Sequence, residues 1–269
     1  MWFRSNRNTG MACRQTGWAQ IASSGVQECM DMGAVAHLSA IQGGIPVQHF
    51  FDGFRTSHEI QKIEVLDYEE LRTILDWDAV ERFRKRALNP EHPTIRNTGE
   101  NDDVFFQHRE ACNSAYDRFP DIVADNMDKI NTITGKNYKL FNYYGASDAE
   151  RVIIAMGSVC ETLREVVTYL NDRGEKVGLI QVHLYRPFSA KYLLQALPVT
   201  AKILSVLDRT KEPGSIGEPL FEDICSVMMG ENRFASLTRT FPETAEKLFA
   251  EAEVQCAERY AKYKEMAKK

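Results

Sequence analysis

Four charged or titratable residues follow a short apolar run that predicts a β-strand over Ile45 to Phe51. They are Asp52, Arg55, His58 and Glu59 in the string Phe-Phe-Asp-Gly-Phe-Arg-Thr-Ser-His-Glu. Ligands of α/β proteins gather at the carboxyl ends of parallel strands, and a histidine beside two carboxylates can transfer protons. The same charges can hold a turn together or cross a subunit interface, because ion-pair networks also form without catalysis. We favour this structural role.

A second charged string, Asp208-Arg209-Thr210-Lys211-Glu212-Pro213-Gly214, follows a predicted strand over Ala201 to Leu207. Arg209 and Lys211 could contact an anionic group. They could equally pair with Asp208, Glu212 or a neighbouring domain. The candidates for interface or anion contacts from the two strings are Arg55, His58, Arg209 and Lys211, and no residue is assigned to catalysis, cofactor or metal binding.

Gly157-Ser158 lies between a predicted strand and a predicted helix. Free N–H groups at such a turn can bind phosphate. However, one glycine pair is a weak motif, and we favour a tight strand-to-helix turn in which Ser158 caps the helix. His183 lies in an apolar strand, where a single histidine is typical of a hydrogen-bonded core residue.

Composition and cysteine spacing exclude several classes of protein. The net charge of −5 argues against a nucleic-acid partner, and no apolar run approaches the ~20 residues that span a bilayer. The six cysteines are far apart and form no C-x-x-C pair. A zinc ribbon or a cysteine-ligated iron–sulfur cluster is therefore not expected. We expect the thiols to be reduced and mostly buried.

The hydrophobic pattern predicts an α/β protein whose strands alternate with helices after residue 137. Strands are expected over Ile45–Phe51, Arg151–Met156, Val177–Leu184 and Ala201–Leu207. Helices are expected over Trp18–Ile41, Asp67–Leu75, Asp78–Leu88, Pro120–Thr132, Val159–Arg173, Ala190–Leu197, Glu218–Met228 and from Thr240 to the C-terminus. Asn89–Asn113 is expected to be a long connection.

Several of these strings resemble the pyruvate:ferredoxin oxidoreductase family. Met11 to Gly17, His49 to Glu64 and Asn89 to Pro93 resemble the later part of its first domain and the connection that follows. Leu184 to Phe188 and Leu207 to Gly214 resemble its second domain, which is related to the C-terminal domain of transketolase. Asn232 to Ala235 and Phe241 to Glu243 resemble the far C-terminus of the family. An internal deletion is therefore expected near Val227 to Gly230.

The resemblance implies a transketolase C-terminal-like domain with a parallel sheet, preceded by a partial pyrimidine-domain-like α/β unit and followed by a long helix. The expected divisions are an unmatched start (residues 1–10), a partial first domain (11–88), a linker with a helix (89–136), the second domain (137–228) and a helical tail (229–269). An Arg-bearing, acid-free start could be a short targeting peptide. The protein is expected in the cytoplasm, or in an anaerobic energy organelle if that segment is a targeting peptide.

Members of this family oxidise pyruvate to acetyl-CoA and pass electrons to ferredoxin, using thiamine diphosphate, magnesium, iron–sulfur clusters and CoA. The family's Gly-Asp-Gly thiamine motif and its runs of cysteine ligands do not occur here. The resemblance therefore implies a truncated relative that binds no cofactor and is inactive alone, and that self-associates or binds chains carrying the missing domains. The alternatives are a non-catalytic subunit of a split 2-oxoacid oxidoreductase and an anion- or nucleotide-binding module.

Overall fold

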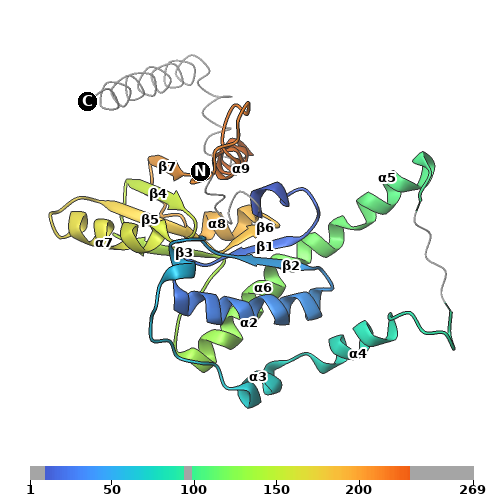
Figure 1. Ribbon diagram of the computed structural model, residues 1–269. Helices are drawn as coiled ribbons and strands as arrows, with labels where there is room; N and C mark the ends of the chain where they lie inside the picture. The colour runs from blue at the N-terminus through green and yellow to red at the C-terminus, as the bar shows by residue number, and fades with distance from the viewer. Residues whose placement is uncertain (1–9, 94–98, 231–269) are drawn as a thin grey trace. The chain divides into compact units, whose positions relative to one another are not determined.

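The computed structural model describes residues 10–93 and 99–230, and the chain divides into two compact units, Met1–Leu220 and Phe221–Lys269. Helix α9 (Pro219–Gly230) lies largely in the second unit and is described by itself. The expected final helix from Thr240 lies outside the described residues. The strands of the first unit form two sheets, which are labelled in Figure 1.

The first sheet has three strands in the order β2-β1-β6. Strands β1 (Ala19–Ala22) and β2 (Val47–Phe50) pair in parallel, and β6 (Leu184–Arg186) pairs antiparallel with β1. The second sheet has the order β3-β5-β4-β7. Its strands are β3 (Phe141–Gly145), β4 (Arg151–Ala155), β5 (Val177–Val182) and β7 (Ile203–Leu207).

The predicted parallel pairing is confirmed, because β4 pairs in parallel with both β5 and β7. Two features of the sheets differ from the prediction. Strand β3 was not expected, and it adds an antiparallel edge to the sheet. The expected strand Val177–Leu184 divides at His183, where the chain leaves the second sheet and continues as β6 of the first.

The expected helix Trp18–Ile41 is wrong in its first part. Ala19 to Ala22 form β1, and helix α2 begins only at Val26 and runs to Gly43. All four residues of β1 are buried. A strand buried on both faces shows no polar alternation that would distinguish it from a helix.

The remaining helices agree with the sequence pattern except between residues 89 and 134. Helix α3 (Tyr68–Ile74) is capped by the Asp67 carboxylate, and α4 (Trp77–Lys85) by that of Asp76. The connection expected over Asn89–Asn113 contains helix α5 (Asp102–Ala111). The next helix, α6, runs over Asn113–Thr134 and holds Pro120 in its interior instead of starting there.

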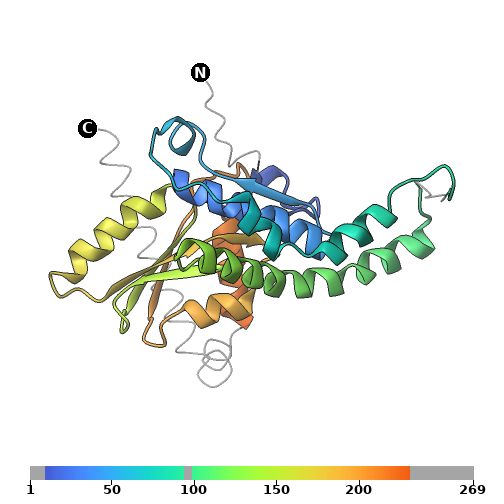
Figure 2. The ribbon, with the colours of Figure 1, turned by 90° about the horizontal axis from the view of Figure 1, so that it is seen from below.

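Helices α2 and α6 pack along one another beside the first sheet (Figures 1 and 2). In the second sheet, α7 (Val159–Asn171) covers the face that carries Tyr144 and Leu179. Side chains alternate between the faces of a strand, so Phe141 and Tyr143 lie on the other face. There they share a cavity with residues of α8 (Ala190–Ala196). Within the described residues, no helix is both long enough and apolar enough to cross a membrane.

Candidate functional site at the junction of the two sheets

Asp52, Ser158 and Arg209 form an ion-pair cluster around the buried Asp52 carboxylate, called here the Asp52 cluster. Asp52 follows β2 and is 1% exposed. One of its carboxylate oxygens accepts the Ser158 N–H at 2.9 Å, the Ser158 hydroxyl, and an N–H of Arg209 at 2.6 Å. Ser158 follows β4 and Arg209 follows β7. The cluster therefore joins the carboxyl ends of strands from both sheets.

The carboxylate of Asp52 takes the place that a phosphate would need at the Gly157-Ser158 turn. It accepts the backbone N–H just before α7, where the helix dipole favours a negative charge. Ser158 does not cap α7, contrary to the sequence prediction. Its backbone is already helical and its hydroxyl is hydrogen-bonded to Asp52.

A second set of buried polar side chains, the Glu28 network, also crosses between the two sheets. Glu28, in the first turn of α2, accepts hydrogen bonds from Arg164 of α7 at 3.1 Å and from Gln181 of β5 at 3.0 Å. It also accepts the Ser24 N–H at 2.7 Å. His183 lies 3.5 Å from the same carboxylate.

The two nitrogens of the His183 ring have different partners. Nδ1 lies 2.8 Å from the Lys139 carbonyl and therefore donates to it, because a carbonyl only accepts. Nε2 lies 2.9 Å from the Gln181 amide. His183 is fully buried, in agreement with its prediction as a hydrogen-bonded core residue.

Opposing effects act on the Glu28 carboxyl. Burial alone raises the pKa of Glu28, but the hydrogen bond and charge of His183 and the hydrogen bonds from Ser24 outweigh burial and lower the pKa far below its ordinary value. Glu28 is therefore a carboxylate throughout the physiological pH range. The network consequently holds a fixed negative charge among buried donors.

Asp31 makes a third polar contact along α2. It is fully buried and accepts from the Lys136 ammonium at 2.8 Å and the Tyr138 hydroxyl at 2.7 Å. Burial first, and then the hydrogen bond to Asp31, raise the pKa of Tyr138. The carboxylates of Glu28, Asp31 and Asp52 come from α2 and the end of β2. Each accepts hydrogen bonds from residues that lie in the second sheet or in the segments next to its strands.

Of the four sequence candidates, Arg209 alone pairs with a buried carboxylate. Lys211 pairs with Glu218 at 2.7 Å on the surface. His58 is exposed and contacts the Ser57 hydroxyl at 2.8 Å, and Arg55 is exposed as well. The acid–base group suggested by Asp52, His58 and Glu59 does not assemble, because Asp52 is buried at the junction and the other two face outward.

Sequence reasoning did not identify Glu28, Arg164 or Gln181 as site residues. One signal was present: Gln181 and His183 are two polar residues two positions apart in an apolar strand, so they share one face. Among the described residues, no three His, Cys, Asp or Glu side chains are placed to hold a metal ion. Of the described cysteines only Cys160 is buried, so the expectation of mostly buried thiols is wrong.

His49 gives the junction a pH dependence that can be measured. It lies on β2 with Nε2 2.8 Å from the Ser23 hydroxyl. Burial, and then the charge of His37, lower the pKa of His49 from 6.5 to about 4. Below pH 6.5 the unfolded chain takes up a proton that the folded chain refuses, so stability should fall as the pH drops from 6.5 towards 4.

At ~1.4 kcal/mol per pKa unit, this contribution is on the order of 3 kcal/mol. Replacing His49 by glutamine should flatten the stability profile between pH 6.5 and 4.5 in urea unfolding. The exposed His58→Gln is the matched control and should leave the slope unchanged. An unchanged slope in His49→Gln would contradict the assignment.

Two family models match the chain. One, described as pyruvate flavodoxin/ferredoxin oxidoreductase, thiamine diP-bdg, matches residues 4–128. The other, pyruvate:ferredoxin oxidoreductase core domain II, matches residues 149–241. The Asp52 cluster and the Glu28 network each join residues of the first matched region to residues of the second.

Curated relatives extend the match over most of the chain. It is 56% identical over 218 residues to the pyruvate:ferredoxin oxidoreductase of Moorella thermoacetica, which covers 81% of this chain and 19% of the relative. It is 60% identical over 215 residues to the pyruvate-flavodoxin oxidoreductase of Enterobacter agglomerans, covering 80% and 18%. The pyruvate dehydrogenase [NADP(+)] of Cryptosporidium parvum is 46% identical over 225 residues, covering 83% and 12%.

The chain thus spans less than one fifth of the length of these relatives. A solved 2-oxoglutarate:ferredoxin oxidoreductase from Magnetococcus marinus is 19% identical with a TM-score of 0.41, covering 70% of this chain and 34% of its own. That likeness is too low to support an argument. The two family models and the high identity to the curated relatives show that this chain belongs to the pyruvate:ferredoxin oxidoreductase family.

Proposed function

We propose that this chain forms the junction between the first two domains of a 2-oxoacid:acceptor oxidoreductase. In this proposal it takes part in pyruvate oxidation only with polypeptide that supplies the thiamine- and cluster-binding parts. The observation that carries the proposal is the Asp52 cluster. Its ion pair connects the two segments of the chain that match the two family models. A carboxylate paired with a guanidinium is not poised for proton transfer.

The residues described here do not fit thiamine diphosphate. The one strand-to-helix turn that the sequence suggested for phosphate, Gly157-Ser158, faces the Asp52 carboxylate, which would repel a diphosphate. The described residues also offer no group of carboxylates for a divalent cation. We therefore assign no step of the reaction to this cofactor on this chain, and propose that other polypeptide binds it.

An anion- or nucleotide-binding module is the weaker alternative. It would use Arg209 and Lys211, but Arg209 donates to Asp52 and Lys211 pairs with Glu218. An anion would have to displace both carboxylates. The observed pairs therefore favour the scaffold function.

The proposal predicts that the full 269-residue chain does not reduce a viologen dye with pyruvate. Thiamine diphosphate, magnesium and CoA are added, and the Moorella thermoacetica enzyme serves as the positive control under the same anaerobic conditions. The expected rate equals that of a no-protein blank. A pyruvate-dependent rate above the blank that survives repeated purification would refute the proposal.

A further inference from the structure

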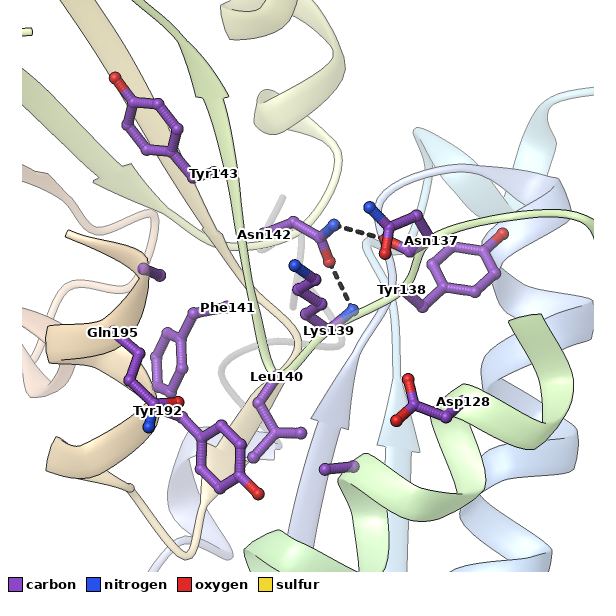
Figure 3. A pocket seen from close by; sticks show the side chains of 12 residues that line it. Asp128, Asn137, Tyr138, Lys139, Leu140, Phe141, Asn142, Tyr143, Tyr192 and Gln195 are labelled. Atoms are coloured by element: carbon purple, nitrogen blue, oxygen red, sulfur yellow. Dashed lines mark hydrogen bonds between the residues drawn. The ribbon is translucent and has the colours of Figure 1, made fainter. Parts of the chain in front are cut away.

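A cavity of about 510 Å³ lies beside the outer edge of strand β3 (Figure 3). Its walls come from α6, the loop that leads to β3, β3 itself and α8. Figure 3 shows Tyr192 and Gln195 of α8 on one side and Asp128 of α6 on the other. The cavity lies outside the Asp52 cluster, and its lining residue Lys139 contacts the Glu28 network through its carbonyl, which accepts from His183.

Strand β3 is an edge strand whose outer backbone groups have no strand partner among the described residues. The His183 N–H donates to the Leu140 carbonyl, and the Ala146 N–H donates to the Val177 carbonyl. Even-numbered residues of β3 therefore bond to β5, since bonded and non-bonded pairs alternate in an antiparallel ladder. The N–H and C=O groups of Phe141 and Tyr143 consequently point outward.

The Asn142 side chain helps to hold the loop that shapes this edge. Asn142 donates to the Asn137 carbonyl and accepts the Lys139 N–H, each at 2.7 Å (Figure 3). These bonds fix the backbone just before the edge strand. The edge is therefore preorganised, which lowers the entropy cost of adding a ligand.

Two charged side chains at the cavity are unpaired. Within the described part of the chain, neither the Asp128 carboxylate nor the Lys139 ammonium has an ion-pair or hydrogen-bond partner, although both line the cavity. Neighbouring lysines are paired: Lys136 contacts Asp31 at 2.8 Å and Lys191 contacts Asp121 at 2.9 Å. One free acid and one free base beside an open strand edge complement a polypeptide better than a simple anion or cation.

We propose that the outer edge of β3 binds an extended segment of a second polypeptide as an added strand. Backbone groups of Tyr143, which is partly exposed, would pair with it, and its charged side chains would meet Lys139 and Asp128. The proposed source is the part of the family polypeptide that this chain does not match, more than four fifths of the Moorella thermoacetica relative. The choice of this source rests on the proposed scaffold function.

The first test uses overlapping peptides of about 12 residues that tile the Moorella thermoacetica enzyme outside the 218 matched residues. Binding to the full chain is measured by fluorescence anisotropy. We expect one or a few peptides to bind, and N-methylation of an amide that pairs with β3 to weaken binding about tenfold, because it removes a hydrogen bond and blocks close approach. N-methylation of the intervening, outward-facing amides should have little effect.

Variants of the chain separate backbone pairing from side-chain contact. Tyr143→Pro removes an outward N–H that the sheet does not use, a change that edge strands tolerate. Tyr143→Ala keeps the N–H and loses the side chain. Binding should fall at least tenfold in Tyr143→Pro and much less in Tyr143→Ala, with both variants folded by circular dichroism. Asp128→Asn and Lys139→Gln should each change binding about two- to fivefold.

Three results would overturn the proposal: no tiled peptide binds, binding ignores N-methylation, or Tyr143→Pro and Tyr143→Ala bind equally. Sedimentation that shows a dimer which Tyr143→Pro dissociates would also overturn it, by identifying a second copy as the occupant. Each result is independent of the dye assay. A failure here is thus distinguishable from a failure of the scaffold function.

Discussion

Replacing Arg209 by alanine is expected to lower the free energy of unfolding by about 3 kcal/mol, because the buried Asp52 carboxylate loses its ion pair with the guanidinium. The Asp52 side chain is 2% exposed, whereas that of Arg209 is 36% exposed. Water can therefore solvate a guanidinium that loses Asp52, whereas the Asp52 carboxylate lies almost fully shielded from water behind its partners. The two single substitutions should differ in cost for this reason.

Asp52→Asn should cost less, about 1 kcal/mol, since its amide oxygen still accepts the Ser158 N–H. The double variant Arg209→Ala with Asp52→Asn should be more stable than Arg209→Ala alone, because the neutral amide has no charge for Arg209 to compensate. Urea unfolding at pH 7 measures all three. Lys211→Ala, which breaks an exposed pair, is the matched control and should not differ from the unchanged protein.

A mere packing role for Arg209 would give a different pattern. Loss of its aliphatic stem would destabilise the protein equally in the Asp52→Asn background and in the unchanged one. The double variant would then be no more stable than Arg209→Ala. That result, or an unchanged midpoint in Arg209→Ala, would exclude the Asp52 cluster as the lock between the two sheets.

Local sequence patterns predicted the elements whose neighbours are close in the chain. Strands β4 and β7 and helix α7 alternate within about 60 residues, and their β-branched runs and glycine ends identify them. A helix was likewise predicted to begin at Asp67, and the Asp67 carboxylate caps α3 by accepting the Glu69 N–H. These features depend on local spacing, which a single sequence displays.

Long-range pairing accounts for most of the errors. Strand β1 is defined by β2 and β6, and β6 lies more than 160 residues further along the chain. The division at His183 exists because the chain there changes sheets. Strand β3 carried a signal that was overlooked, the aromatic run Phe141 to Tyr144, which is typical of strands.

The candidate site was predicted only in part for a related reason. Asp52 and Arg209 each follow a predicted strand, so both were placed at carboxyl ends. That these ends belong to two different sheets, and meet, follows from tertiary packing alone. The domain divisions and the partners expected from the family stay predictions.

Replacing Glu28 by glutamine is expected to destabilise the chain by about 4 kcal/mol at pH 7. The carboxylate accepts from Arg164, Gln181 and the Ser24 N–H, and hydrogen bonds to a charged acceptor are worth more than those to an amide. The amide NH2 of a glutamine would also face the N–H donors that now bind the Glu28 carboxylate. The junction would then hold a guanidinium and a buried histidine with no negative charge between them.

The pH dependence distinguishes this electrostatic role from packing. The folded-state pKa of Glu28 is lowered, so its stabilisation is complete above its ordinary value of 4.5 and is lost as the pH falls below that value. The stability difference between the unchanged protein and Glu28→Gln should therefore shrink between pH 4.5 and 3.5, and the His49 effect, common to both proteins, cancels in this difference.

Glu161→Gln is the matched control on α7. Burial, and then the negative charges of Glu28 and Glu59, raise the pKa of Glu161, so its charge is unfavourable in the folded chain. Removing that charge should leave stability unchanged or raise it at pH 7, the opposite sign to Glu28→Gln. Equal destabilisation by both substitutions, or a Glu28→Gln deficit that stays constant down to pH 3.5, would show that the Glu28 carboxylate contributes shape and not charge to the junction.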